Sequence, residues 1–319
     1  MDSEALSGSH EVQHAPPSTG GGPVEKIFLN ERGLRAGWRL LIYAMLVAVL
    51  GTGSMIVARQ FIRPVRGAFS PGLLLFQEAM VFVVVFGSAL IMSRLEKRPP
   101  GAYGLPASQA FGKLFWQGWL VGLCEVTALM GLIATFHGYT FGHVVLHGAD
   151  LLRWATLWGV FFVVVGLFEE FLFRGYTQFT LADGIGFWPA AVLLSTVFGL
   201  THLSNPGEGW VGAASVVMIG LILALGLRRT GNLWFVVGLH ASFDFGETFL
   251  YSVPNSGIVF DGHRHRSPAS CDASGVARNS ATSRSARSAP GVCFSVSALS
   301  FLAEFQPCCV FVSLAGYRM

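Results

Sequence analysis

The chain has 319 residues, of which 52% are hydrophobic and only 12% are charged, and its mean hydropathy is +0.56. Soluble domains carry roughly 25% charged residues, so this composition indicates a polytopic membrane protein, with lipid as its surroundings, and argues against one or two soluble domains. The net charge of +3 is small and no basic patch alternates with aromatic residues, which argues against a nucleic-acid partner.

Residues 1–35 are expected to form a disordered cytosolic tail and a basic lead-in to the membrane. Residues 1–24 are dominated by Ser, Gly, Pro, His and acidic residues, without the apolar segment of a signal peptide. The five cysteines of the whole chain show no CxxC spacing, so they indicate neither a zinc ribbon nor a disulfide framework.

Seven apolar segments follow, each near the roughly 20 residues that a helix needs to cross a bilayer. They are expected at residues 38–58, 71–93, 114–136, 154–181, 186–204, 209–227 and 233–252. The predicted fold class is therefore all-α, a polytopic transmembrane helical bundle of about seven to eight spans within residues 36–252.

The lysines and arginines between these segments predict the orientation of the bundle. Ten lie on the side of the N-terminus: Lys26, Arg32, Arg35, Arg39, Arg94, Lys97, Arg98, Lys113, Arg228 and Arg229. Four lie on the other side: Arg59, Arg63, Arg66 and Arg153. Because cytoplasmic loops carry the excess of positive residues, we predict a multi-pass protein of the cell membrane with its N-terminus in the cytoplasm.

Residues 253–319 are interpreted as a low-complexity C-terminal tail. Residues 263–290 hold seven Ser, five Arg and no aromatic residue, and four of the five cysteines lie beyond residue 262. The abrupt change and the loss of periodicity favour a frameshift or gene-model error. The alternative is a disordered linker followed by a weak eighth span.

The fourth apolar segment carries three charges in the stretch GLFEEFLFRGY, residues 166–176: Glu169, Glu170 and Arg174. A charge at bilayer depth costs about 2.5–3.5 kcal/mol on insertion scales, so ionisable residues there indicate function by default. Glu170 and Arg174 are spaced i,i+4 and can pair on one helix face, while Glu169 points about 100° away.

Two further polar motifs lie in later apolar segments. They are FGLTH, which ends at His202, and HASFD, which begins with His240 and ends with Asp244. His240 and Asp244 are also i,i+4, so both can point into one cavity. Helix lengths place His202 near the depth of the glutamates, whereas His240 needs a strong tilt or kink to reach it.

A carboxylate near two imidazoles suits the activation of water for hydrolysis of an amide. Two versions of this chemistry stay open. In one, the glutamate is the general base and no metal takes part. In the other, Glu169, His202, His240 and Asp244 are ligands of a zinc ion that acidifies the water.

The three motifs EExxxR, FxxxH and HxxxN/D, in this order on successive segments, resemble the CPBP family of intramembrane proteases. This family includes the CAAX prenyl endopeptidases and the bacterial Abi or bacteriocin-immunity proteins, and the resemblance covers roughly residues 95–250. It implies a helical membrane core with an internal catalytic cavity and a membrane-associated peptide or protein substrate. It further implies Glu169 as the base, supported by Glu170 and Arg174, with His202 as its partner.

The resemblance also implies that His240 and Asp244 bind the oxyanion or a metal. We favour the metal-free version because EExxxR lacks the paired histidines of HExxH. The chain departs from the family where Asp244 replaces the usual Asn, since a carboxylate donates no hydrogen bond unless it is protonated. A proton-coupled transporter and a non-catalytic immunity or scaffold protein of the membrane are the alternative functions.

Overall fold

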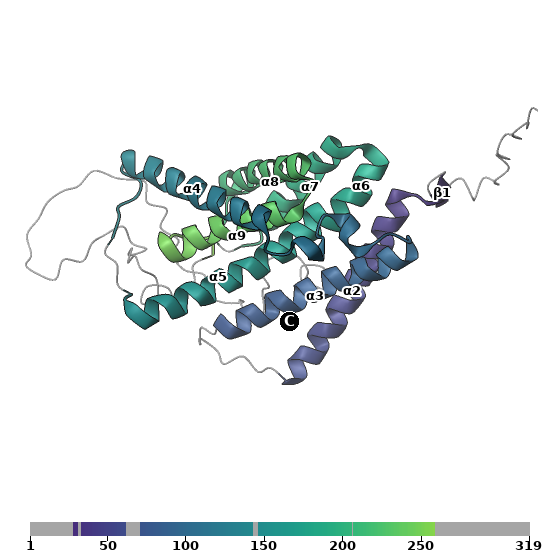
Figure 1. Ribbon diagram of the computed structural model, residues 1–319, viewed down its shortest axis with the longest axis horizontal. Helices are drawn as coiled ribbons and strands as arrows, with labels where there is room; N and C mark the ends of the chain where they lie inside the picture. The colour runs from purple at the N-terminus through teal and green to yellow at the C-terminus, as the bar shows by residue number, and fades with distance from the viewer. Residues whose placement is uncertain (1–27, 31–32, 62–70, 143–145, 206, 259–319) are drawn as a thin grey trace, which may run out of the picture.

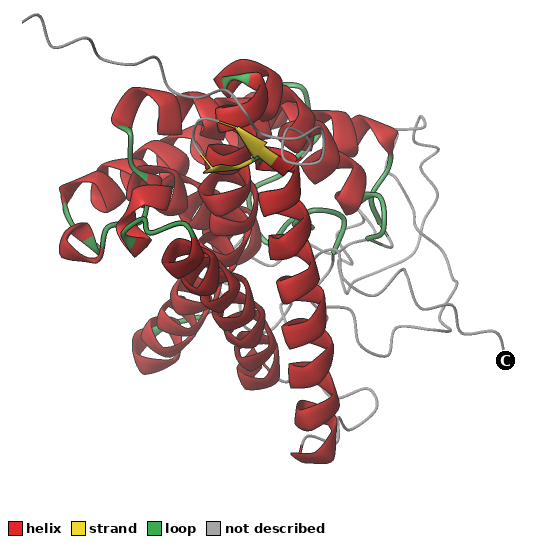
Figure 2. Cartoon of the chain, turned by 90° about the vertical axis from the view of Figure 1, so that its right-hand side faces the viewer, coloured by secondary structure: helices red, strands yellow, loops and turns green. Residues whose placement is uncertain are grey.

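The computed structural model describes residues 28–30, 33–61, 71–142, 146–205 and 207–258, so residues 259–319 of the tail expected over 253–319 lie outside these residues. Apart from the loops, the described part is helical except for a hairpin of two very short strands and an isolated bridge (Figure 2). Its α-helices are α2 (Ala36–Phe61), α3 (Pro71–Leu95), α4 (Lys113–Thr135), α5 (Gly148–Glu170), α6 (Thr177–Ile185), α7 (Phe187–His202), α8 (Trp210–Thr230) and α9 (Leu233–Phe245).

Short elements connect the long helices. The hairpin consists of β1 (Leu29–Asn30) and β2 (Gly33–Leu34), which pair antiparallel directly before α2. Two 3₁₀ turns, η1 (Pro100–Tyr103) and η2 (Ala107–Gln109), lead into α4. Two π-helices, η3 (Phe171–Tyr176) and η4 (Gly246–Leu250), follow α5 and α9 without a break.

Five helices of the described chain are long and apolar enough to cross a membrane. They span Ala36–Phe61, Gly72–Leu95, Lys113–Thr135, Gly148–Ile185 and Trp210–Thr230. The all-α membrane fold is thus confirmed, but the count of seven to eight spans is not. Of the two remaining expected segments, α7 has 16 residues, about 24 Å of helix, which is short of a bilayer core of about 30 Å. Helix α9 has 13 residues and almost all of them are buried in the protein, so its apolar sequence serves the core.

Helix α9 lies between α4 and α5 (Figure 1). Its close approach to α4 depends on three glycines that leave no room for a side chain. A Cβ atom at Gly118 would lie 1.9 Å from the carbonyl oxygen of Phe235, and one at Gly122 would lie 2.2 Å from that of Leu239. The same holds for Gly238 on α9, where a Cβ atom would lie 2.1 Å from the carbonyl oxygen of Phe115 on α4. Small residues four apart let helix backbones touch in this way in membranes, and here they fix the position of α9.

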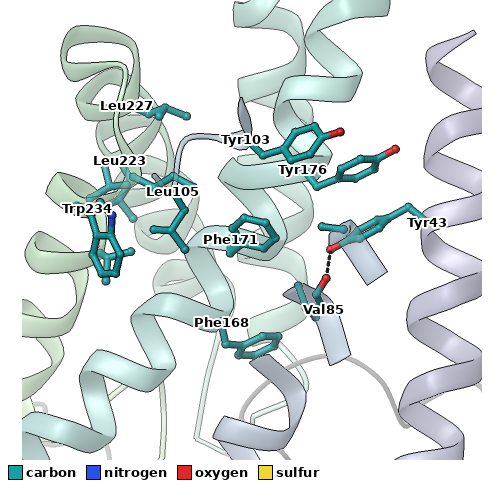
Figure 3. Close-up of a cluster of buried hydrophobic side chains, with 14 of the residues drawn as sticks. Tyr43, Val85, Tyr103, Leu105, Phe168, Phe171, Tyr176, Leu223, Leu227 and Trp234 are labelled. Atoms are coloured by element: carbon teal, nitrogen blue, oxygen red, sulfur yellow. Dashed lines mark hydrogen bonds between the residues drawn. The ribbon is translucent and has the colours of Figure 1, made fainter. Parts of the chain in front are cut away.

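The main core cluster joins helices from both ends of the described chain (Figure 3). Phe168 and Phe171, on either side of the two glutamates, are 0% and 1% exposed. Tyr43 of α2 donates a hydrogen bond to the carbonyl oxygen of Val85 on α3, at 3.3 Å. Because both neighbours of the glutamate pair are locked in this core, the end of α5 has little freedom to rotate.

A second fixed point is an ionic network where α2, α3 and α6 meet. Arg39 of α2 pairs with Glu96 at 2.5 Å and with Asp183 of α6 at 2.9 Å. Tyr103 and Tyr176 donate their hydroxyls to the same Glu96 carboxylate. Burial and the nearby carboxylate raise the pKa of the Tyr103 phenol well above its ordinary value, so this hydroxyl stays a donor.

Candidate active site

The two adjacent glutamates occupy the last turn of α5. Glu169 and Glu170 are both buried, and the residues that follow them wind into η3 instead of continuing the α-helix. Within η3 the backbone kinks at Gly175, whose ψ of −122° is not helical. Asp244 lies two residues before the other π-helix, η4. Single π turns are rare in proteins, and those that occur are often found at functional sites. Here one follows Glu169 and Glu170, and the other follows Asp244.

The ion pair of Glu170 and Arg174 that the i,i+4 spacing predicts is present in the structure. Nη1 of Arg174 donates to Oε1 of Glu170 at 3.1 Å, and both side chains are essentially excluded from solvent. The guanidinium carbon lies 4.4 Å from the centre of the Phe198 ring, which adds a cation–π contact. Gly220 of α8 leaves room for this arginine, because a Cβ atom there would lie 2.7 Å from its Nη2.

His240 joins α9 to the end of α5. Its Nδ1 lies 2.7 Å from Oε1 of Glu170. Because a carboxylate paired with an arginine accepts hydrogen bonds, Nδ1 is the nitrogen that carries a hydrogen. Its Nε2 lies 3.4 Å from Oδ2 of Asp244 and 3.6 Å from Oε2 of Glu169. The ring therefore stands between three carboxylates, and the structure supplies the close approach that helix lengths alone left open.

His202 ends α7 and is oriented by its own helix. Its Nδ1 lies 2.7 Å from the carbonyl oxygen of Phe198, one turn earlier. A carbonyl oxygen only accepts, so Nδ1 donates and Nε2 is the nitrogen that is left for another partner. Phe198 packs edge-on against the His202 ring with centroids 4.6 Å apart. The FxxxH spacing thus fixes both the tautomer and the orientation of the histidine.

A small cavity lies between these helices. Its volume is about 30 Å³, and it is lined by Phe161, Phe162, Val165, Glu169, His202, Asn205, His240, Asp244, Asn255, Ser256 and Ile258. A water molecule needs roughly 10–15 Å³ by this measure, so the cavity has room for the nucleophile of a hydrolysis. Helix α5 contributes three apolar side chains and Glu169, and the remaining lining residues come from α7, the loop after it, α9 and the segment after η4.

Four of the six predicted site residues line this cavity: Glu169, His202, His240 and Asp244. The other two, Glu170 and Arg174, do not line the cavity. Arg174 pairs with Glu170, which accepts a hydrogen bond from Nδ1 of the cavity residue His240. Sequence reasoning missed Asn205, Asn255 and Ser256, which also line the cavity. Asn205 lies three residues after the FGLTH motif, and this proximity in the sequence points to it. Asn255 and Ser256 lie beyond residue 252, where the tail was expected to begin.

The donor set does not favour a metal centre. Within the described ranges, no group of three or more His, Cys, Asp or Glu side chains is arranged to hold a metal ion. Nδ1 of His240 and Nδ1 of His202 are both committed to protein oxygens, and Nε2 of His240 is paired with two carboxylates. Metal-ligating histidines also make Nδ1 bonds of this kind and bind through Nε2, so it is the lack of a grouped donor set among the described residues, and not these bonds, that argues against zinc.

Comparison with known proteins identifies one region of the chain. A sequence model described as type II CAAX prenyl endopeptidase Rce1-like matches residues 150–246. A curated protein of Rhodococcus erythropolis, named "Putative transporter protein AmiS2", is 33% identical over 96 residues, which are 30% of this chain and 45% of that protein. The chain thus spans less than half the length of this relative, and no solved structure matches the chain.

The matched region contains all six residues predicted from the motifs. Together with the five apolar helices, the match indicates a multi-pass membrane protein. The resemblance to the CPBP family of intramembrane proteases, expected over roughly residues 95–250, is confirmed for residues 150–246, which are similar to the Rce1-like family.

Proposed function

We propose that the protein is an intramembrane endopeptidase that hydrolyses a peptide bond of a membrane-associated substrate. One observation carries this proposal: Glu169, His202 and His240 come from three helices and line one cavity large enough for water. Ionisable residues gathered in this way inside apolar helices are typical of a functional site and costly as a mere anchor. The protease core is assigned to about residues 95–250 of a transmembrane domain over 36–252.

In the proposed mechanism Glu169 is the general base. Its carboxylate takes a proton from a water molecule in the cavity, and the water oxygen attacks the carbonyl carbon of the scissile peptide bond. The carbonyl oxygen then carries the negative charge of a tetrahedral intermediate. When the C–N bond breaks, Glu169 returns the proton to the leaving amine, so atoms and charges balance. His202 accepts a hydrogen bond at Nε2 and orients the water.

Glu170 and Arg174 act as positioning residues. Arg174 fixes the Glu170 carboxylate, which in turn holds His240 by its Nδ1 hydrogen. The opposite nitrogen of His240 then faces Glu169 and Asp244, at the boundary of the cavity. A site held in this way needs little reorganisation when charge develops during the reaction.

A prenylated CAAX-type peptide is the substrate class that the family match suggests. The proposed topology places the N-terminus in the cytoplasm, on the side with the excess of Lys and Arg. A transport function gains no support from the R. erythropolis protein, because that similarity covers less than a third of this chain.

The test is a cleavage assay in detergent with prenylated and unprenylated hydrophobic peptides, read by mass spectrometry. The intact chain is compared with Glu169→Gln, which removes the base but keeps the shape. Products that require Glu169 support the endopeptidase. Equal cleavage by both proteins, or no cleavage by a folded intact chain, contradicts it. If the folded intact chain cleaves nothing, both proteins are reconstituted in liposomes. Peptide or proton transport that is lost in Glu169→Gln would then support the transporter.

A further inference from the structure

A tight turn after η4 closes one side of the cavity. Asn255 and Ile258 form an antiparallel bridge, with the backbone N–H of each bonded to the carbonyl oxygen of the other at 3.1 and 2.8 Å. Ser256 and Gly257 between them have φ values of +46° and +75°. Positive φ at both central residues is typical of a type I′ turn. This turn lies beyond the region that matches the protease family, and three of its residues line the cavity: Asn255, Ser256 and Ile258.

The turn is held against the segment that follows α7. Nδ2 of Asn205 donates to the carbonyl oxygen of Ser256 at 2.8 Å. The backbones of Gly207 and Gly257 touch, since a Cβ atom at Gly207 would lie 2.3 Å from the carbonyl oxygen of Gly257. Gly257 also has no room for a Cβ, which would lie 2.5 Å from the backbone nitrogen of Glu208. The turn therefore has a fixed position relative to His202, three residues before Asn205.

One donor in this arrangement is not used. The Asn255 side chain is only 8% exposed, and its Nδ2 has no hydrogen-bond partner among the described residues. The backbone groups of Asn255 are occupied by the bridge, and the side-chain amide of Asn205 donates to the carbonyl oxygen of Ser256. A buried N–H group without a partner is destabilising, so its presence in a cavity wall points to a ligand that accepts its hydrogen bond.

The cavity side chains that the three motifs supply offer no uncommitted donor, because Nε2 of His240 also faces two carboxylates. Glu169 and Asp244 are carboxylates, and Nδ1 of each histidine is committed to a protein oxygen. The proposed hydrolysis creates a negative oxygen on the substrate, which needs N–H or O–H donors aimed at it. Asp244 cannot supply one while it is ionised.

We propose that the side-chain amide of Asn255 donates a hydrogen bond to the oxyanion of the tetrahedral intermediate, and so supplies the donor that Asp244 cannot. This inference rests on the proposed function and adds a catalytic residue to it. The N–H bond stays intact during the reaction, and no further reactant is needed.

The experiment compares Asn255→Ala and Asn255→Asp with the intact chain in the peptide cleavage assay. Asn255→Asp keeps the size of the side chain and removes the N–H groups. Loss of a donor used only in the transition state should lower kcat by about 100-fold or more in both variants while KM changes little. A phosphinic peptide that mimics the tetrahedral intermediate should lose affinity by a similar factor, while Glu169→Gln binds uncleaved substrate equally well with and without Asn255→Ala.

The outcomes separate this inference from the proposed function. If cleavage requires Glu169 but Asn255→Asp retains its kcat and its affinity for the phosphinic peptide, the endopeptidase stands and the role of Asn255 is wrong. A lower melting temperature with unchanged kcat would assign Asn255 to stability and also overturn the inference. If Glu169→Gln cleaves as well as the intact chain, the proposed function fails first, and the oxyanion role fails with it.

Discussion

Nδ1 of His240 lies 2.7 Å from Oε1 of Glu170, and this bond connects the only two helices of the described chain that bring carboxylates to the cavity wall, α5 and α9. The same Glu170 oxygen accepts from Arg174 at 3.1 Å. One buried oxygen thus holds a cation on its own helix and an imidazole on another. This acceptor directly links the end of α5, which carries Glu169, to His240 on α9.

We predict that Arg174→Met is strongly destabilising. It leaves the Glu170 carboxylate buried without its cation, which costs about 3–5 kcal/mol in comparable buried pairs. The double variant Glu170→Gln, Arg174→Met should recover part of this loss, because no unpaired charge remains. Thermal unfolding in detergent measures the stability of both variants. Equal stability of Arg174→Met and the intact chain would contradict the prediction.

For the general base, we expect Glu169→Gln to lower kcat by a factor on the order of 10²–10⁴. Glu125→Gln is the matched control, since Glu125 is a half-buried carboxylate of α4 that does not line the cavity. Cleavage rates and melting temperatures of both variants are compared. If the control loses as much activity as Glu169→Gln, the effect is due to a buried charge in general and not to the base.

The helix contact that positions α9 gives a third prediction. Gly122→Ala should reduce stability by about 1–3 kcal/mol and also reduce activity, because a Cβ atom there would collide with the backbone of Leu239, next to His240. Gly131→Ala lies on the same helix with nothing within 4 Å of its added Cβ. It should be neutral or stabilising by up to about 1 kcal/mol. If thermal unfolding showed Gly131→Ala to be less stable than Gly122→Ala, this packing of α4 against α9 would be excluded.

Chelators provide a fourth test. We expect cleavage to persist after treatment with EDTA or 1,10-phenanthroline, since no three His, Cys, Asp or Glu side chains of the described residues are grouped to hold a metal ion. The rate is measured before treatment, after it, and after dialysis against Zn²⁺. Loss of activity that zinc restores would show that a metal takes part and that the ligand set rearranges to bind it.

The ionic network at Glu96 gives a fifth prediction with a built-in control. Arg39 and Arg98 both contact Glu96 and Asp183, but the Arg39 side chain is 8% exposed and that of Arg98 is 38% exposed. Arg39→Met should cost about 3–5 kcal/mol, as expected for a buried pair. Arg98→Met should cost at most about 1 kcal/mol, because solvent screens an exposed pair. Equal losses in chemical unfolding would contradict this difference in burial.

Much of the site could be predicted from the order and spacing of its motifs. The i,i+4 relation of Glu170 and Arg174 follows from helical geometry, and the two residues pair as this geometry predicts. The all-α membrane fold follows from composition, because only helices of this length satisfy their backbone in lipid without a closed barrel. The sequence also contains a GxxxG packing motif, Gly118 to Gly122, at which α4 contacts α9.

The tertiary structure decided what local pattern cannot encode. Hydropathy does not distinguish a helix in lipid from one buried in protein, so α9 appeared as a span although the rest of the molecule surrounds it. The depth of His240 depends on the contact between α4 and α9, which joins residues more than 100 positions apart. Asn255 reached the cavity only because a turn packs against the end of α7, a contact between two loops that no periodicity records. The sequence alone determined the chemical groups, and long-range packing determined which of them share one cavity.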